Sequence, residues 1–459
     1  MPPRLISFRP TLSFVLLCLL LAVLWIAGGA SREDALGQVV VRAAAAAVLV
    51  ILALFGHRRR AAPARPVWLI LGAAILLPVV QLIPLPPELW LSLPGRDTFA
   101  QAGQLAGGQP WRPLSLVPGA TFNAVASLLI PVAVLALATS VSARERDWLP
   151  GVLLGVIAVS MVVGLLQFTG VGLNNPLIND TPGVVSSSFA NRNHFALFLA
   201  VGCVLAPGWA LLHPQDGGWR NGVALGLVLL FVLTILATGS RAGIGLGALA
   251  LLIGLVLARQ AMRRHRGRMP RWFGAAVVSA AIGFVGGAIA LSVAAGRAVS
   301  IDRLLQINVG DDMRSQALPT VLDMIRTYLP LGTGFGSFDP LFRMHEPDAL
   351  LQPNYFNHAH NDMLEVVLDG GLAGGALLAA ALIWWAMAGV RAWRGRASEG
   401  STPARLGAAI ILLVALASCF DYPARTPMFM AVLGLAGVWL AGVAAQPDRL
   451  ALPKGDGNL

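Results

Sequence analysis

The stretch LPGVLLGVIAVSMVVGLLQFTG (149–170) runs for 22 residues without a charged side chain. A bilayer core requires about 20 apolar residues per helix. A segment inside the bilayer must also satisfy its own backbone hydrogen bonds, which a helix does. This stretch therefore predicts a transmembrane α-helix, and similar stretches recur along the chain.

Twelve stretches of this kind predict about 12 transmembrane helices. Their ranges are approximately 11–30, 37–56, 66–84, 120–140, 149–170, 194–212, 220–238, 241–259, 272–295, 371–390, 404–420 and 426–444. Of the whole chain, 56% is hydrophobic and only 12% is charged, whereas a soluble protein carries about 25% charged residues. We therefore expect an all-α integral membrane protein that forms a single polytopic domain over residues 1–459.

Arginine-rich connections alternate with arginine-poor ones, and cytoplasmic loops carry the excess of basic residues. The arginine-rich connections are HRRRAAPAR (57–65), SARERD (142–147), RQAMRRHRGRMPR (259–271) and RAWRGRASEGSTPAR (391–405). The opposite connections are 31–34, 171–193, 239–241 and 420–427. This alternation predicts that both termini are cytoplasmic.

The net charge of +11 does not indicate a nucleic-acid-binding protein. The basic residues fall in short clusters between apolar runs rather than on one polar face, so we expect membrane lipids as partners and no nucleic acid. Cys18, Cys203 and Cys419 each lie within an apolar run. They predict neither a disulfide framework nor a metal-binding motif.

Two long connections, 85–119 and 296–370, fall on the outer side. PLPPELWLSLPG (84–95) combines tryptophan and leucine with prolines and predicts an interfacial segment with aromatic anchors. Long loops are usually functional, and within the second one RSQALPTVLDMIRTY (314–328) predicts an amphipathic helix. Its apolar stripe is formed by Leu318, Val321, Leu322 and Ile325.

Three arginines stand out because they lie on the side where arginine is scarce: Arg192, Arg241 and Arg314. Three guanidinium groups in one outer cleft would clamp a pyrophosphate, since the planar fork pairs oxygens two at a time. The alternative for each is an arginine at a helix end that reaches to the lipid headgroups.

The segment NYFNHAHNDMLEVVLDGGLAGG (354–375) places His358, His360, Asn361 and Asp362 just outside the tenth predicted span. A neutral histidine can accept a proton from a sugar hydroxyl, and Asp362 or Asn361 could orient its ring. The first alternative is a structural histidine that is bonded to a loop carbonyl.

Two other interpretations of the outer polar residues involve a metal. His345, His358 and His360 could form a zinc site. Glu33–Asp34 or Asp311–Asp312 could bind Mg²⁺ or Mn²⁺ in a metal-dependent glycosyltransferase. A different class altogether is a transporter or flippase of lipid-linked sugars, but the sequence shows no internal repeat of the kind that transporters have.

Three further motifs lie on the same predicted side. FANRNHFA (189–196) contains a Phe-x-Asn-x-Asn pattern with Asn191 and Asn193. TGSRAG (238–243) contains a Ser-Arg-x-Gly turn, and LPLGTGFGSF (329–338) contains a glycine-rich turn after a proline.

The most specific pattern is a His-Asn pair (His360 and Asn361), then nine residues, then Gly371 and Gly374. In their order and sidedness, these motifs resemble the O-antigen ligase/polymerase family of bacterial surface-polysaccharide glycosyltransferases. The resemblance covers residues 150–375, a family core that includes the long periplasmic loop 296–370. Glu365 departs from it, since many relatives have a neutral amide there.

The resemblance implies a polytopic helical fold like that of type C membrane glycosyltransferases, in the bacterial inner membrane with a periplasmic active site. The donor would be a glycan on undecaprenyl pyrophosphate. The acceptor would be lipid A–core for a ligase of lipopolysaccharide biosynthesis, or a lipid-linked repeat unit for an O-antigen or exopolysaccharide polymerase. The absence of an added soluble domain argues against protein acceptors.

The resemblance also implies roles for residues. His360 would be the catalytic base of an inverting transfer, with Arg241 stabilising the leaving charge. No metal or other cofactor would be required, because arginines would hold the diphosphate. The substrate-binding residues would be Arg192, Arg241, Arg314, Asn191, Asn193, His358, Asn361 and Asp362.

Overall fold

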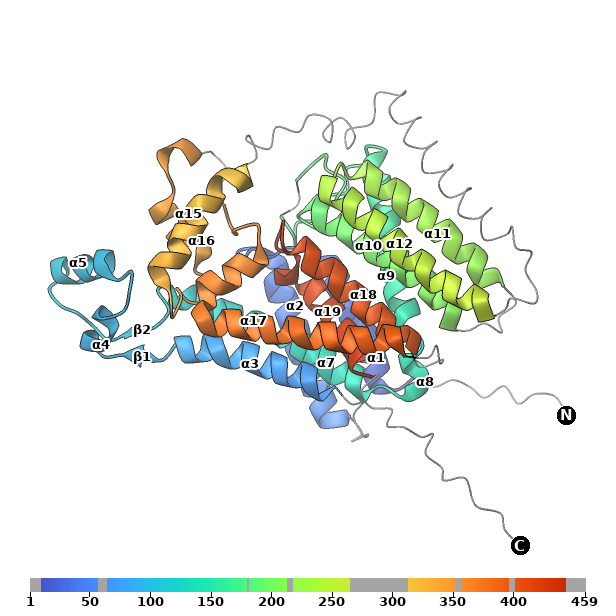
Figure 1. Ribbon diagram of the computed structural model, residues 1–459, viewed down its shortest axis with the longest axis horizontal. Coiled ribbons are helices and arrows are strands. Elements are labelled where there is room, and N and C mark those ends of the chain that lie inside the picture. Colours follow the sequence, from blue (N-terminus) through green and yellow to red (C-terminus); the bar gives the residue numbers. More distant parts are fainter. Residues whose placement is uncertain are drawn as a thin grey trace, which may run out of the picture.

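The structure is a computed structural model. It describes residues 10–56, 64–179, 181–212, 218–264, 313–351, 356–395 and 401–442. Long apolar helices form a bundle, and the shorter helices within 87–105 and 313–345 gather at one end of it (Figure 1). The long helices are α1 (Leu12–Ala27), α2 (Leu36–Phe55), α3 (Arg65–Gln81), α7 (Leu129–Ser140), α9 (Leu149–Phe168), α10 (Arg192–Leu212), α11 (Trp219–Ala237), α12 (Arg241–Arg264), α17 (Asp362–Arg394), α18 (Ser401–Ala417) and α19 (Pro427–Ala441).

The all-α prediction is confirmed for the described residues, in which the only strands are two residues long. Seven helices or helix pairs are long and apolar enough to span a membrane, and four further apolar helices are shorter. Eleven of the predicted spans therefore coincide with helices. The remaining span, 272–295, lies outside the described residues, so the count of twelve stays a prediction.

The predicted span 120–140 consists of two helices, α6 (Pro118–Ser127) and α7, which meet at Leu128. Pro131 explains the break, because proline has no N–H to donate to the carbonyl of Ser127. The two helices still form one apolar unit of 23 residues.

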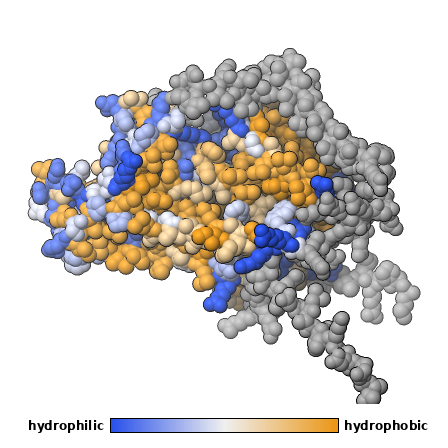
Figure 2. Space-filling view, in the orientation of Figure 1, coloured by the Kyte–Doolittle hydropathy of each residue, from blue (hydrophilic) through white to orange (hydrophobic). Residues whose placement is uncertain are grey.

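Helix α10 lies at the centre of the bundle and packs against α9, α11, α12 and α18. In its apolar window, 78% of the residues are buried, as expected for a helix that is apolar on every side. By contrast, Val39 and Leu54 of α2 are 68% and 70% exposed. Figure 2 shows apolar side chains covering the flank of the bundle, with polar ones gathered around the end that carries α5 and α15. Such a surface fits a lipid environment.

The first outer connection forms an arm of β1 (Pro84–Leu85), α4 (Pro87–Leu91), α5 (Asp97–Leu105) and β2 (Arg112–Pro113). The two strands pair antiparallel. The prediction of an aromatic anchor at the membrane interface is wrong for Trp90, because this side chain is 2% exposed. Its indole N–H donates to the carbonyl of Pro113 at 2.8 Å, and the guanidinium groups of Arg96 and Arg112 lie 5.0 Å from the ring centroid. Trp90 therefore holds the arm together.

The described part of the second outer connection contains α15 (Met313–Tyr328), α16 (Phe338–His345) and the short η2 (Asp348–Leu350). The predicted amphipathic helix is confirmed, but its stripe is partly wrong. The buried residues are Ala317, Val321, Met324 and Tyr328. Leu318 and Leu322 are exposed, because α15 packs with the neighbouring face toward α16 and α17.

Helix α17 begins nine residues before the predicted span, at Asp362, and is kinked at Gly371. Gly371 has φ 59° and ψ −149°, which only glycine adopts readily. A Cβ atom there would collide with the carbonyl of Pro330, and the N–H of Leu372 donates to that carbonyl at 2.9 Å. The kink therefore docks α17 onto the glycine-rich turn, and it accounts for Gly371 in the sequence pattern.

Candidate active site

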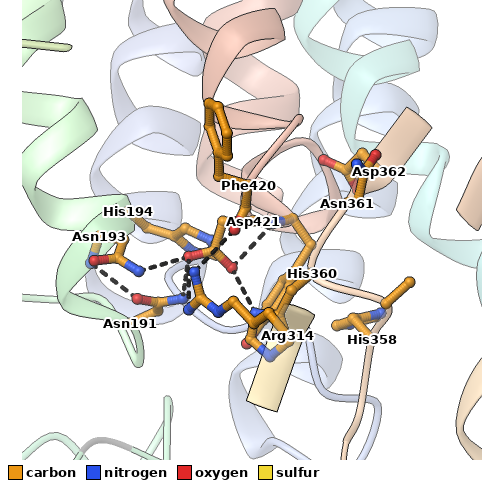
Figure 3. A network of polar contacts seen from close by, with 12 residues as sticks. Asn191, Asn193, His194, Arg314, His358, His360, Asn361, Asp362, Phe420 and Asp421 are labelled. Atoms are coloured by element: carbon orange, nitrogen blue, oxygen red, sulfur yellow. Dashed lines mark hydrogen bonds and ion pairs between the residues drawn. The ribbon is translucent and has the colours of Figure 1, made fainter. Parts of the chain in front are cut away.

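The centre of the polar network is Asp421, which lies in the turn between α18 and α19 and is 4% exposed. Its Oδ2 atom accepts hydrogen bonds from the side-chain amides of Asn191 and Asn193, at 3.0 and 2.8 Å. Its Oδ1 atom lies 3.1 Å from Nδ1 of His360. Figure 3 shows these side chains converging on the carboxylate from two different segments of the chain.

His360 stands immediately before Asn361, the N-cap residue of α17. Its φ of 50° is unusual for a residue other than glycine, and such conformations often occur at functional sites. An ionised carboxylate only accepts hydrogen bonds, so Nδ1 carries the hydrogen and Nε2 keeps its lone pair. The Asp421 pairing therefore orients the His360 ring and leaves the Nε2 lone pair able to accept a proton.

The ionisation of Asp421 supports this arrangement. Burial by itself raises the pKa of this carboxyl group, but the hydrogen bond from His360 and the positive charge of Arg314 lower the pKa more. The net pKa lies well below the usual value of aspartate. Asp421 is therefore negatively charged at neutral pH and accepts the hydrogen bond from Nδ1 of His360.

Arg314, near the start of α15, is the predicted arginine that reaches the network directly. Its guanidinium donates to the carbonyl of Phe420 at 2.9 Å and lies 3.8 Å from Oδ2 of Asp421. The side chain is 35% exposed, so part of the cation faces the outside of the protein beside the base.

Arg192 and Arg241 are the first residues of α10 and α12. Arg192 is half-buried and lies between the two asparagines that bind Asp421, and Arg241 is exposed. Ser240, which precedes Arg241, donates from its hydroxyl to Oδ1 of Asn193 at 2.7 Å. The two segments are therefore joined at the network, although no contact of either guanidinium with Asp421 is seen among the described residues.

His358 belongs to a second, adjoining cluster. Its Nδ1 lies 2.9 Å from Oε1 of Glu365 and its Nε2 lies 3.1 Å from Oγ of Ser31. Both ring nitrogens are thus engaged, which makes His358 a poorer candidate for a base than His360. The ring packs 4.4 Å from that of Tyr422, centroid to centroid.

Arg425 joins this cluster to α17. Its guanidinium lies 3.1 Å from Asp362, 3.1 Å from Glu365 and 3.7 Å from Asp369. Burial alone lowers the pKa of Arg425, but the carboxylates of Glu365 and Asp369 raise it above its usual value. Glu365, the residue at which the sequence departs from the family pattern, therefore has a structural role, because its carboxylate pairs with both Arg425 and His358.

The interpretation that Asn361 or Asp362 orients the base histidine is corrected by these contacts. Asn361 caps α17 by accepting from the N–H of Leu364, and its amide donates to the carbonyl of Cys419 at 3.1 Å. Asp362 accepts from the hydroxyl of Ser418 at 2.8 Å and pairs with Arg425. Both lie apart from the Asp421 carboxylate in Figure 3.

Sequence reasoning missed Asp421, Tyr422, Arg425 and His194. The first three lie in the turn CFDYPAR (419–425), which the charge pattern of the sequence marks only as an arginine-poor outer connection. An acid and an arginine in a short outer turn were the available signal, since charges at a membrane boundary are costly unless they are paired or functional.

The metal-binding alternatives find no assembled ligand set among the described residues, where no three acidic, histidine or cysteine side chains are grouped for a metal. His345 pairs instead with the Tyr328 hydroxyl at 3.0 Å. Asp34 forms an ion pair with Arg32. Asp311 and Asp312 lie outside the described residues.

Residues 226–379 match the family model described as O-antigen ligase. The chain is a membrane protein that contains a region of the O-antigen ligase/polymerase family. The match identifies it as a glycan-transferring enzyme and contains Arg241, Arg314, His358 and His360, whereas Asp421 lies beyond it. No curated protein matches the chain.

Proposed function

We propose that this member of the O-antigen ligase family is an inverting glycosyltransferase of the bacterial inner membrane. It moves a glycan from undecaprenyl pyrophosphate to an acceptor hydroxyl at the periplasmic face. The observation that carries the proposal is the His360–Asp421 pair beside Arg314. It combines an oriented base with a cation at one end of an apolar helix bundle.

His360 acts on the acceptor. Its Nε2 removes the proton from the acceptor hydroxyl as that oxygen attacks the anomeric carbon of the donor sugar. The bond from this carbon to the pyrophosphate oxygen breaks on the opposite side, so the configuration at the carbon inverts. Asp421 stabilises the imidazolium that forms, because its carboxylate remains charged and stays bonded to Nδ1.

The arginines act on the leaving group. Undecaprenyl pyrophosphate departs with additional negative charge, and preorganised cations at that position lower the barrier. Arg314 lies in the network, and Arg192 and Arg241 stand beside the residues that link Asn193 to Ser240 and Asp421. Guanidinium groups supply the positive charge here, so we propose that the transfer is metal-independent.

The first prediction tests the base. His360→Ala should lower the rate of glycan transfer by about 10²–10⁴-fold, the usual contribution of a general base. The measurement is transfer by the purified protein in lipid nanodiscs, with a synthetic lipid-linked donor and a saturating acceptor. His345→Ala is the matched control, because His345 bonds to Tyr328 away from the network. Near-normal transfer by a correctly folded His360→Ala protein would contradict the proposed role.

The acceptor is tested in a strain that lacks this chain, by comparing its lipopolysaccharide and secreted polysaccharide on gels. A ligase predicts loss of long glycan on lipid A–core while polymer accumulates on the lipid carrier. A polymerase predicts loss of long polymer altogether, with single repeat units remaining.

A further inference from the structure

A cavity of about 280 Å³ lies next to the His360–Asp421 pair. One wall is the loop between α1 and α2, and another is the loop that precedes α10. Tyr422, Asn191 and Asn357 also line the cavity, and the Tyr422 ring packs 4.9 Å from that of His360, centroid to centroid. The cavity therefore shares part of its wall with the network that holds the base.

A buried histidine also lines this cavity without a hydrogen-bond partner. His194 is 2% exposed, and neither of its ring nitrogens is hydrogen-bonded within the part of the chain that is described. Oδ1 of Asp421, 3.8 Å from Nε2, is too far for a hydrogen bond. Buried polar groups normally have partners, so His194 is an unsatisfied polar residue in the wall of the cavity.

The charge of the cavity favours a neutral ligand. Among the described residues that line it, the only arginine is Arg32, which donates two hydrogen bonds to the carboxylate of Asp34, at 2.9 and 2.6 Å. That pairing largely neutralises the cation, so the walls present mainly the hydroxyl of Ser31, side-chain amides and the phenol of Tyr422. Such groups both donate and accept hydrogen bonds, which matches sugar hydroxyls better than phosphate oxygens.

We propose that this cavity is a subsite for one sugar residue of the glycan substrate, next to the residue that reacts. The inference rests on the proposed function. The volume is at the lower end of the range for ligand pockets, about 300–1,000 Å³, which suits a single ring rather than an oligosaccharide. The sugar belongs to either the donor glycan or the acceptor glycan, and kinetics distinguish the two.

Two substitutions test the subsite without changing the catalytic residues. Ala190 lines the cavity and is half-buried, so Ala190→Leu fills space, while Ala190→Ser is a matched control that keeps the volume. Asn179 lines the exposed rim with φ 51°. Asn179→Gly removes its amide and accepts that backbone conformation without strain.

The experiment measures KM for donor and acceptor separately, in nanodiscs, together with the thermal unfolding of each variant. We expect Ala190→Leu to raise the KM of one substrate about tenfold because the larger side chain excludes the sugar. Asn179→Gly should raise the same KM about tenfold, equivalent to the loss of one or two neutral hydrogen bonds. The KM of the other substrate and the behaviour of Ala190→Ser should match the wild type. A higher KM for the donor assigns the sugar to the donor, and a higher KM for the acceptor assigns it to the acceptor.

Wild-type KM values for both substrates in Ala190→Leu would overturn the subsite while leaving the proposed function intact, and would indicate a cavity that holds only water. If Ala190→Leu does not fold, Asn179→Gly decides in the same way. A wild-type protein that transfers no glycan would contradict the proposed function itself.

Discussion

At the scale of single residues, the site depends on a carboxylate that is ionised despite its burial. Asp421 receives hydrogen bonds from Asn191, Asn193 and His360, and charge-assisted hydrogen bonds are the strongest kind. Asn191 precedes α10, Asn193 lies in its first turn, and His360 lies just before α17. One side chain therefore both orients the base and joins distant segments of the chain.

A second prediction concerns this side chain. Asp421→Asn should lower the transfer rate by about 10²–10⁴-fold, because an amide that donates to Nδ1 moves the hydrogen onto Nε2. The measurement is steady-state transfer in nanodiscs, with Asp323→Asn as control, since Asp323 forms an exposed pair with Arg326. A rate within twofold of the wild type would show that Asp421 does not set the tautomer of His360.

A third prediction follows from the lowered pKa of Asp421. A carboxyl group whose folded-state pKa is depressed stabilises the protein above its unfolded pKa, about 3.9 for aspartate, and loses that contribution as the pH falls through the folded pKa. In a His360→Ala background, where this histidine no longer titrates, the stability difference caused by Asp421→Asn should therefore be constant from about pH 6 to 8 and shrink only below about pH 4. Chemical denaturation at a series of pH values measures it, and a gap that changes near neutral pH would contradict an ionised Asp421.

The sequence indicated much of this network but not its centre. His360, Arg314, Asn191 and Asn193 were identifiable because polar residues beside apolar runs are rare and lie on one predicted side. Asp421 was not, since it is 61 residues from His360 and nothing in the local pattern tells which outer turn packs against which.

At the scale of elements, hydropathy predicts where helices lie and fails to predict how they bend or which face they bury. The break at Leu128 arises because Pro131 has no N–H to donate within an otherwise apolar run. Helix α17 begins early because the side chain of Asn361 caps its first turn within a polar run. The buried face of α15 is set by α16 and α17, its packing partners, and its own mixed periodicity could not reveal it.

The fourth prediction tests the kink in α17. Gly371→Ala should destabilise the protein by at least about 1–3 kcal/mol, the cost of such a backbone conformation in a residue other than glycine, because the new Cβ also meets the Pro330 carbonyl. Gly375→Ala, one turn further along, is the control. Its Cβ would meet only the side chain of Val367 at an ordinary 3.5 Å. Thermal unfolding in detergent measures both, and equal stability of the two variants would mean that the kink is not required.

At the scale of the whole molecule, polarity is divided between the flank and one end. The exposed flank is apolar, and α4, α5, α15 and α16 gather at one end (Figures 1 and 2). Arg314 of α15 lies 3.8 Å from Asp421, so the network adjoins that end. The arginine-rich connection 142–147 belongs to the predicted opposite side. A donor carried by a lipid in the outer leaflet would meet the network directly, provided that this end is periplasmic.

The native cysteines provide the last prediction, which tests that orientation. Cys419 is exposed and stands two residues before Asp421, whereas Cys18 is half-buried and Cys203 is buried. A membrane-impermeant maleimide added to intact spheroplasts should therefore label the wild type but not Cys419→Ser, since thiol reactivity requires access. Arg144→Cys, introduced into the Cys419→Ser protein, serves as the opposite marker, because Arg144 is exposed in the connection predicted to be cytoplasmic. It should be labelled only after the membrane is permeabilised. The reverse pattern would place Asp421 and His360 in the cytoplasm, where a glycan presented at the periplasmic face could not reach them.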